Sequence, residues 1–280
     1  MSAMVRSVVV AMALALGASG LACAEPSEQS ADESSPPSSD ELKQIPPTGL
    51  SKDQLKAEVR RIALENTLKT DDASLAAARK QLNPLIADLA RIYGTPPASV
   101  ELDNGFAGTW KQLFSDDFRA APPGAPVADQ ASIHQVVTKN GYFYNFSNQV
   151  LPTPPSAPSV VLTVFLRGEY TAAPLAHGLD IKFTRLGTLP SALPASEQIG
   201  ALAANIESGA IGAAAPGNAP GAGPTSGTGG PPPGARGPVG VKGKLQNLYL
   251  DADLRVSLGG TQDQLFNKVY VLERVPPTGK

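Results

Sequence analysis

The chain has 280 residues and a formal net charge of −2. The chain has no excess of basic residues and no cluster of them along the sequence, whereas a nucleic-acid-binding protein has a concentrated basic surface. Nucleic-acid-binding proteins are therefore excluded. The single cysteine, Cys23, lies near the N-terminus, so the rest of the chain has no disulfide, cysteine nucleophile or cysteine metal ligand. A folded domain here must therefore be stabilised by apolar burial and backbone hydrogen bonds.

Residues 1–24 are predicted to be a secretory signal peptide. Arg6 supplies the positive charge before an apolar segment, Val8–Leu21, that is too short to span a bilayer. Two processing routes remain open. The sequence Ala22-Cys23-Ala24 is a small-residue cleavage box that would release a soluble chain, whereas lipid attachment at Cys23 would anchor the chain to a membrane surface. Both routes export the protein to the periplasm or cell envelope.

Residues 25–50 are predicted to be a disordered acidic tether. The segment contains six acidic residues and one basic residue, together with prolines and serines. This composition offers too little apolar surface to offset the entropy lost on ordering. A polar segment of this kind suits a leash between a membrane anchor and a folded domain.

Residues 51–94 are predicted to form a helical hairpin. Ser51 and Gln54 have the spacing of a capping box at the start of the first helix. Pro84 lies inside the second helical pattern and is expected to kink or split it, and Gly94 should end it. Apolar residues recur at helical spacing in both segments, so the hairpin must pack one face against another element.

From residue 102 onward the apolar period changes to that of β-strands. Asn140-Gly141 is expected to join two strands, because this pair adopts the positive φ angles of a tight hairpin turn. The expected strands are 109–114, 133–138, 142–146, 160–170, 181–186, 245–250, 254–258 and 269–274. About eight antiparallel strands indicate a mainly β domain, built as a barrel or a sandwich.

Residues 188–243 interrupt the strand pattern and are predicted to be an inserted surface loop. A weak helical pattern spans residues 197–211, and a run rich in Gly, Pro and Ala follows it. Glycine recurs at every third position near the end of this run, but over too short a length for a collagen helix. The composition favours a disordered loop between two strands.

The C-terminal block NLYLDADLRVSLGG, followed by VYVLERV, resembles the closing motif of the plastid lipid-associated protein (fibrillin) family. Leu258 stands where members of the family commonly have arginine. Residues 106–114, which contain Gly108-Thr109-Trp110, resemble the opening strand of the family. The residues that match the closing motif are Tyr249, Leu250, Asp251, Leu254, Arg255, Val256 and Gly259.

This resemblance covers residues 51–275 apart from the insert. It implies a lipocalin-like antiparallel β-barrel of about eight strands, formed by residues 102–187 and 244–275, with the helical hairpin at its N-terminal side. It also implies a barrel that holds a lipid or another small amphiphile, with no chemistry assigned. The family is usually plastid and cyanobacterial, so its plastid roles do not carry over to a chain with an export signal.

Aromatic residues on the expected strands are the candidate ligand contacts. Tyr142, Tyr144 and Phe146 share one face, because side chains alternate along a strand. Arg255 or Arg274 is expected to lie on Trp110 as a cation–π partner. The alternative is that Trp110, Asp251 and Arg255 only close the barrel. The full candidate set is Trp110, Tyr142, Tyr144, Phe146, Phe165, Phe183, Tyr249 and Arg255.

No catalytic motif stands out in the sequence. Neither His134 nor His177 has acidic neighbours at metal-ligand spacing, and nucleophile-elbow and phosphate-loop patterns are missing. Asp116-Asp117 has the composition of a solvated turn. We therefore expect no catalytic residue, no metal and no cofactor.

The sequence favours non-enzymatic binding of a lipid or other small amphiphile at the cell envelope. The alternative is a structural envelope lipoprotein whose barrel is filled by its own side chains and which acts through protein or lipid-surface contacts. The size of the cavity separates these two classes. A third class, an esterase or isomerase, would need polar groups that converge in the cavity.

Overall fold

The computed structural model describes residues 39–94, 96–118, 125–151, 153, 158–172, 178–212, 239–261 and 268–276. The expected signal peptide with Cys23, most of the expected tether, and His177 lie outside these residues.

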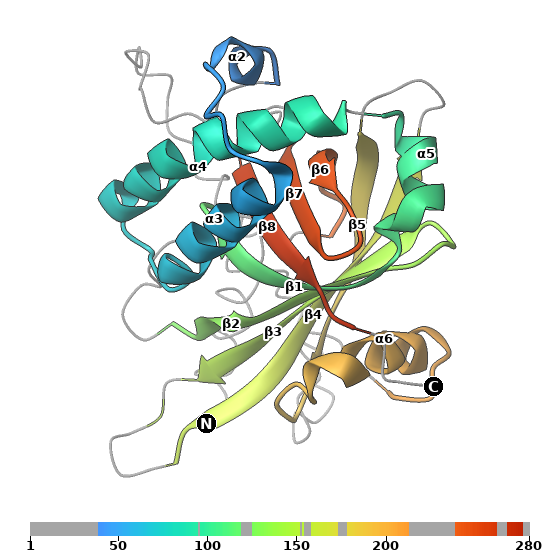
Figure 1. Ribbon diagram of the computed structural model, residues 1–280. Coiled ribbons are helices and arrows are strands. Elements are labelled where there is room, and N and C mark those ends of the chain that lie inside the picture. Colours follow the sequence, from blue (N-terminus) through green and yellow to red (C-terminus); the bar gives the residue numbers. More distant parts are fainter. Residues whose placement is uncertain are drawn as a thin grey trace, which may run out of the picture.

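The described residues form a closed barrel of eight antiparallel strands, in which each strand pairs with its neighbours in sequence and β1 pairs with β8 (Figure 1). This confirms the predicted fold class. Every strand pairs with two neighbours, although β5 and β6 pair over only four residues, Leu179–Lys182 with Lys242–Leu245. The strands are β1 (Gly108–Ser115), β2 (Val127–Val137), β3 (Tyr142–Leu151), β4 (Val160–Ala172), β5 (Leu179–Leu189), β6 (Lys242–Leu250), β7 (Leu254–Thr261) and β8 (Lys268–Arg274).

The helical hairpin consists of α3 (Lys52–Glu65) and α4 (Asp72–Tyr93), which pack against each other. The capping box at the start of α3 is present, and Gly94 ends α4 in a left-handed conformation. The apolar faces of both helices cover the outer surface of β1 and of β6 to β8 (Figure 1). One core therefore lies between the hairpin and the barrel wall.

Of the two effects expected of Pro84, a kink or a split in the second helix, the split does not occur. Helix α4 continues through Pro84 as a single element. Proline removes one backbone hydrogen bond, whereas Leu82 and Leu85 on either side of it are buried against the barrel. Burial of two leucines outweighs the loss of one hydrogen bond.

The expected tether is also ordered at its end. Residues 39–50 include helix α2 (Ser39–Gln44) and a segment that packs on α4. Leu42 is buried there, and the Thr48 backbone N–H donates to the Asp88 carboxylate at 2.8 Å. The packed domain therefore begins before residue 51, because these few apolar and polar groups find partners on α4.

Two further segments cover the barrel. Helix α5 (Ala98–Glu101) and the turn η1 (Leu102–Phe106) lead into β1 and bring Phe106 into the barrel interior. The turn η2 (Ser196–Gln198) and helix α6 (Ile199–Glu207) lie in the expected insert and pack on the outer face of β2 to β4 (Figure 1).

The insert is thus only partly a loop. Strand β5 continues to Leu189, and α6 buries four apolar side chains against the sheet: Ile199, Leu202, Ala203 and Ile206. The weak helical pattern was correct, but the prediction of a surface loop is wrong for this part. The Gly- and Pro-rich residues 213–238 lie outside the described residues.

Candidate functional site

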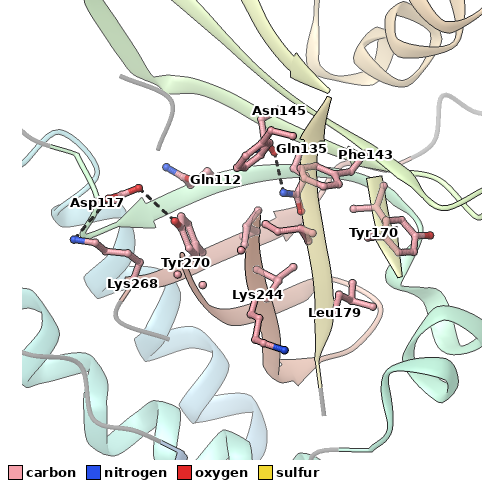
Figure 2. A pocket seen from close by; sticks show the side chains of 18 of the residues that line it. Gln112, Asp117, Gln135, Phe143, Asn145, Tyr170, Leu179, Lys244, Lys268 and Tyr270 are labelled. Atoms are coloured by element: carbon pink, nitrogen blue, oxygen red, sulfur yellow. Dashed lines mark hydrogen bonds and ion pairs between the residues drawn. The ribbon is translucent and has the colours of Figure 1, made fainter. Parts of the chain in front are cut away.

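The barrel contains a cavity of about 310 Å³, which all eight strands help to line. This volume is at the lower end of the range of about 300–1,000 Å³ that is usual for small-molecule sites. Side chains therefore do not fill the barrel completely. Figure 2 shows labelled side chains from β1 to β6 and from β8 converging on this space.

One side of the cavity wall is polar. Gln135 donates from Nε2 to Asn145 Oδ1 at 2.9 Å, as the dashed line in Figure 2 shows, and Gln112 lies on the neighbouring strand. Arg255 completes this side and donates from Nη2 to Gln135 Oε1. The side chains of these residues present amide and guanidinium groups to the cavity.

The other side is mostly apolar. Residues of β3, β4, β5 and β6 supply it. Phe143 lies directly against Gly168, where a Cβ atom would come within 2.4 Å of the ring, so glycine is required at that position. A ligand in this cavity would meet amides and a cation on one side and hydrocarbon on the other. The apolar wall contains Phe143, Tyr170, Leu179, Ile181, Phe183 and Leu245.

Arg255 is the most unusual residue of the wall. It is 1% exposed, and its guanidinium lies 5.1 Å from the Phe106 ring and 5.0 Å from the Trp110 ring. Within the described part of the chain, its Nε and Nη1 atoms have no hydrogen-bond partner. Burial, followed by repulsion from Arg274, lowers the pKa of Arg255 to about 9, and the charge of Glu101 opposes this shift.

Arg274 has a different environment beside the same tryptophan. Its guanidinium lies 4.1 Å from the Trp110 ring and donates to the backbone carbonyls of Ala107 and Gly105. Gly108 allows this approach, because a Cβ atom there would lie 2.3 Å from the guanidinium. Arg274 therefore closes the barrel end, whereas Arg255 borders the cavity.

Three lysines line the cavity at the opposite end of β7 and β8 from Arg255. Lys268 approaches Asp117 at 3.6 Å (Figure 2), and Lys244 pairs with Asp180 at 2.7 Å. Lys242 is exposed at the first residue of β6. Carboxylates therefore neutralise two of the three lysines at this end.

Only two of the eight predicted ligand residues, Phe183 and Arg255, line the cavity. Trp110 is inside the barrel, but its indole N–H donates to the Phe106 carbonyl and its ring carries the two arginines. Tyr249 lies outside, beneath the helical hairpin. The interior position expected for the remaining four is wrong, because they lie on the outer face near α6: Tyr142, Tyr144, Phe146 and Phe165.

The four residues were placed inside the barrel wrongly because side chains alternate between the two faces of a strand. Period-2 patterns separate two faces of β3, and the face with Phe143 and Asn145 turns inward. The face with Tyr144 and Phe146 is equally apolar, since α6 covers it. The helical pattern at 197–211 was the signal that an outer face needed apolar partners. Gln135 and Asn145 were not among the predicted contacts, because that prediction used aromatic residues as the signal.

Charged and polar groups hold α6 in place. The Glu207 carboxylate at its end accepts from Arg167 Nε at 2.9 Å and from the Tyr144 hydroxyl at 2.5 Å. At its other end, His134 Nε2 lies 3.0 Å from Ser196 Oγ, and Nδ1 lies 2.8 Å from the Ser132 carbonyl. Burial lowers the pKa of His134. These contacts indicate that His134 holds the start of η2 in place.

The predicted solvated turn at Asp116-Asp117 is wrong for its first residue. Asp116 is 4% exposed, pairs with Arg79 of α4, and accepts from the Val269 backbone N–H at 2.9 Å. Its carboxylate therefore joins the hairpin to the barrel. In the part of the chain that the structure describes, no cluster of His, Cys, Asp or Glu could hold a metal ion. No helix among those residues has the length and apolar character needed to cross a membrane.

Comparisons with protein-family models, with curated proteins and with solved structures give no match. The resemblance to the plastid lipid-associated family therefore depends on the residues of the two motifs and on the barrel architecture.

Proposed function

We propose that this protein binds a lipid or another small amphiphile in the barrel cavity and catalyses no reaction. The observation that carries the proposal is an unfilled cavity with one polar and one apolar wall. An amphiphile satisfies both walls at once, whereas a purely polar molecule would leave the apolar wall of β4 to β6 without a partner. The family resemblance supports the same function.

The competing function was a structural lipoprotein with a filled barrel. A cavity of about 310 Å³ argues against it, because close-packed interiors leave few voids larger than a water molecule. For catalysis, the lining within the described residues offers one carboxylate, Asp117, which Lys268 and Tyr270 already engage. That arrangement favours a binding role.

We further propose that the protein acts outside the cytoplasm. The apolar segment at residues 8–21 supports export, and the choice between a lipid anchor at Cys23 and cleavage after Ala24 stays open. A lipid anchor would place the cavity close to a membrane surface, which is the source of its ligand.

The test is ligand binding by the purified protein. Dansyl-undecanoic acid should bind with micromolar or better affinity, and organic extraction followed by mass spectrometry should release a co-purified amphiphile. Ile181→Trp places a large ring in the cavity and should weaken binding of the probe about tenfold or more. Val160→Trp adds the same ring at an exposed position on β4 and should leave binding unchanged.

Circular dichroism establishes that both variants fold, and Leu245→Phe is a milder way to fill the same space. If the probe binds the wild type no better than an unrelated barrel, and extraction yields no amphiphile, the binding function is wrong.

A further inference from the structure

We infer that the ligand of the cavity is an anionic amphiphile and that its head group binds at Arg255. This inference rests on the proposed binding function and adds the chemical class of the ligand to it. The evidence is a buried cation with two nitrogens that have no partner among the described residues, the neutral character of its hydrogen-bond acceptor, and the position of Gln135.

An arginine that is buried without a partner is costly. In folded proteins, the cost of taking a guanidinium out of water is offset by a carboxylate, a phosphate or a full set of hydrogen-bond acceptors. Arg255 is 1% exposed and donates from Nη2 to the neutral amide of Gln135, whereas its Nε and Nη1 atoms have no hydrogen-bond partner among the described residues. Contacts with the Phe106 and Trp110 rings compensate only part of this cost.

The two arginines over the Trp110 ring have different counter-charges. The charge of Glu101 acts on Arg255, and the charge of Asp251 acts on Arg274. Glu101 is buried and also accepts from Tyr93 and Asn247 at 2.9 Å each, so hydrogen bonds hold it in place. Two nitrogens of Arg255 still lack an acceptor among the described residues, and an anionic head group would supply one.

Gln135 marks where the head group would bind. Its Oε1 atom accepts from Arg255, in the position that an oxygen of a ligand carboxylate would take. Gln135 lines the cavity, and its side-chain N–H donates to Asn145, so the two amides can turn to donate to the ligand. The apolar wall from β3 to β6 receives the tail.

The test compares charged and neutral ligands with the same tail. Nile red, a neutral fluorescent probe, is bound to the purified full chain and displaced by oleate, oleyl alcohol or oleyl phosphate, each below its aggregation concentration. Oleate should displace the probe from the wild type at about tenfold lower concentration than oleyl alcohol, because a hydrogen bond to a charged group adds affinity of that order. Oleyl phosphate should also displace it better than oleyl alcohol, because it too carries a charged acceptor.

Arg255→Met should remove the preference for oleate and leave displacement by oleyl alcohol unchanged or improved. Arg185→Met is the matched control, since Arg185 is an exposed arginine that lies 5.5 Å from the Phe165 ring on the outer face. This control should keep the preference for oleate.

The outcomes distinguish a failure of this inference from a failure of the proposed function. If Nile red binds the wild type but oleate and oleyl alcohol compete equally, the cavity binds apolar molecules and the inference is wrong. If neither Nile red nor any competitor binds, the proposed function itself fails. Should Arg255→Met not fold, Arg255→Lys keeps the charge and should keep part of the preference, and the wild-type comparison alone still decides.

Discussion

The two faces of β3 and β4 are built in opposite ways. On the outer face, Tyr144, Phe146 and Phe165 pack against one another and under α6, with ring centroids 5.5–6.1 Å apart. On the inner face of the same strands, Asn145 borders an unfilled cavity, and the fully buried Gln149 has a side-chain oxygen without a hydrogen-bond partner among the described residues.

This difference shows that the more aromatic face is the structural one. Rings that fill a closed interface stabilise the fold, whereas a face meant for a ligand must keep space and polar groups that the protein does not satisfy by itself. We therefore expect substitutions on the outer face to reduce stability, and those on the inner face to change binding more than stability.

The largest expected effect is that of Phe165→Ala on the outer face. Phe165 is completely buried and lies over Gly187, so its removal leaves a cavity beneath α6. Urea unfolding should show a loss of about 3–5 kcal/mol. The matched change on the inner wall, Phe183→Ala, should cost less because Phe183 is only partly buried. An equal loss for both, or lost binding in folded Phe165→Ala, would contradict this contrast between the faces.

A smaller effect is expected from Glu207→Gln, which alters the contact between α6 and the outer face. Hydrogen bonds from Arg167, and also from Tyr144, hold the pKa of Glu207 below its ordinary value although burial opposes them. A carboxylate with a lowered folded-state pKa stabilises the protein fully above its unfolded-state pKa, and loses this contribution as the pH falls through the folded-state pKa. The variant should therefore be less stable by about 1 kcal/mol near neutral pH, since the carboxylate is partly exposed.

The difference between wild type and Glu207→Gln should shrink in acid, as measured by urea unfolding across the acidic range. Glu169→Gln is the control, because Glu169 contacts the same arginine at 3.0 Å but its side chain is 55% exposed. A gap that widens in acid would show that the sign of the linkage is wrong.

The smallest expected effect is a gain in stability on the inner face. Gln149→Met removes a buried oxygen that lacks a partner, together with a long hydrogen bond of 3.3 Å from Nε2 to Ser147 Oγ, and it keeps the shape of the side chain. Stability should therefore stay the same or rise by about 1 kcal/mol. Thr163→Val is the comparison on the outer face, where the hydroxyl donates to the Ser191 carbonyl at 2.8 Å. That variant should lose about 1 kcal/mol. Thermal unfolding of both variants would reveal whether the inner face alone carries unsatisfied groups.

The sequence by itself determined the local elements. Eight segments of period 2 became the eight strands, Ser51 and Gln54 formed the capping box, and Asn140-Gly141 formed the turn between β2 and β3, with φ of 82° at Gly141. These features depend on neighbouring residues and on backbone geometry, which a sequence pattern records directly. The contact between arginine and Trp110 also followed from the motifs, and both Arg255 and Arg274 make it.

Only the tertiary structure decided which face of the strands turned inward. Alternation separates two faces but gives neither a direction, and a strand covered by a helix outside and a cavity inside has no polar face to mark the solvent. The burial of Asp116 against Arg79, the continuity of α4 through Pro84, and the isolation of Arg255 all depend on groups far apart in sequence. Long-range packing set these features, and it also set the unfilled cavity on which the proposed function rests.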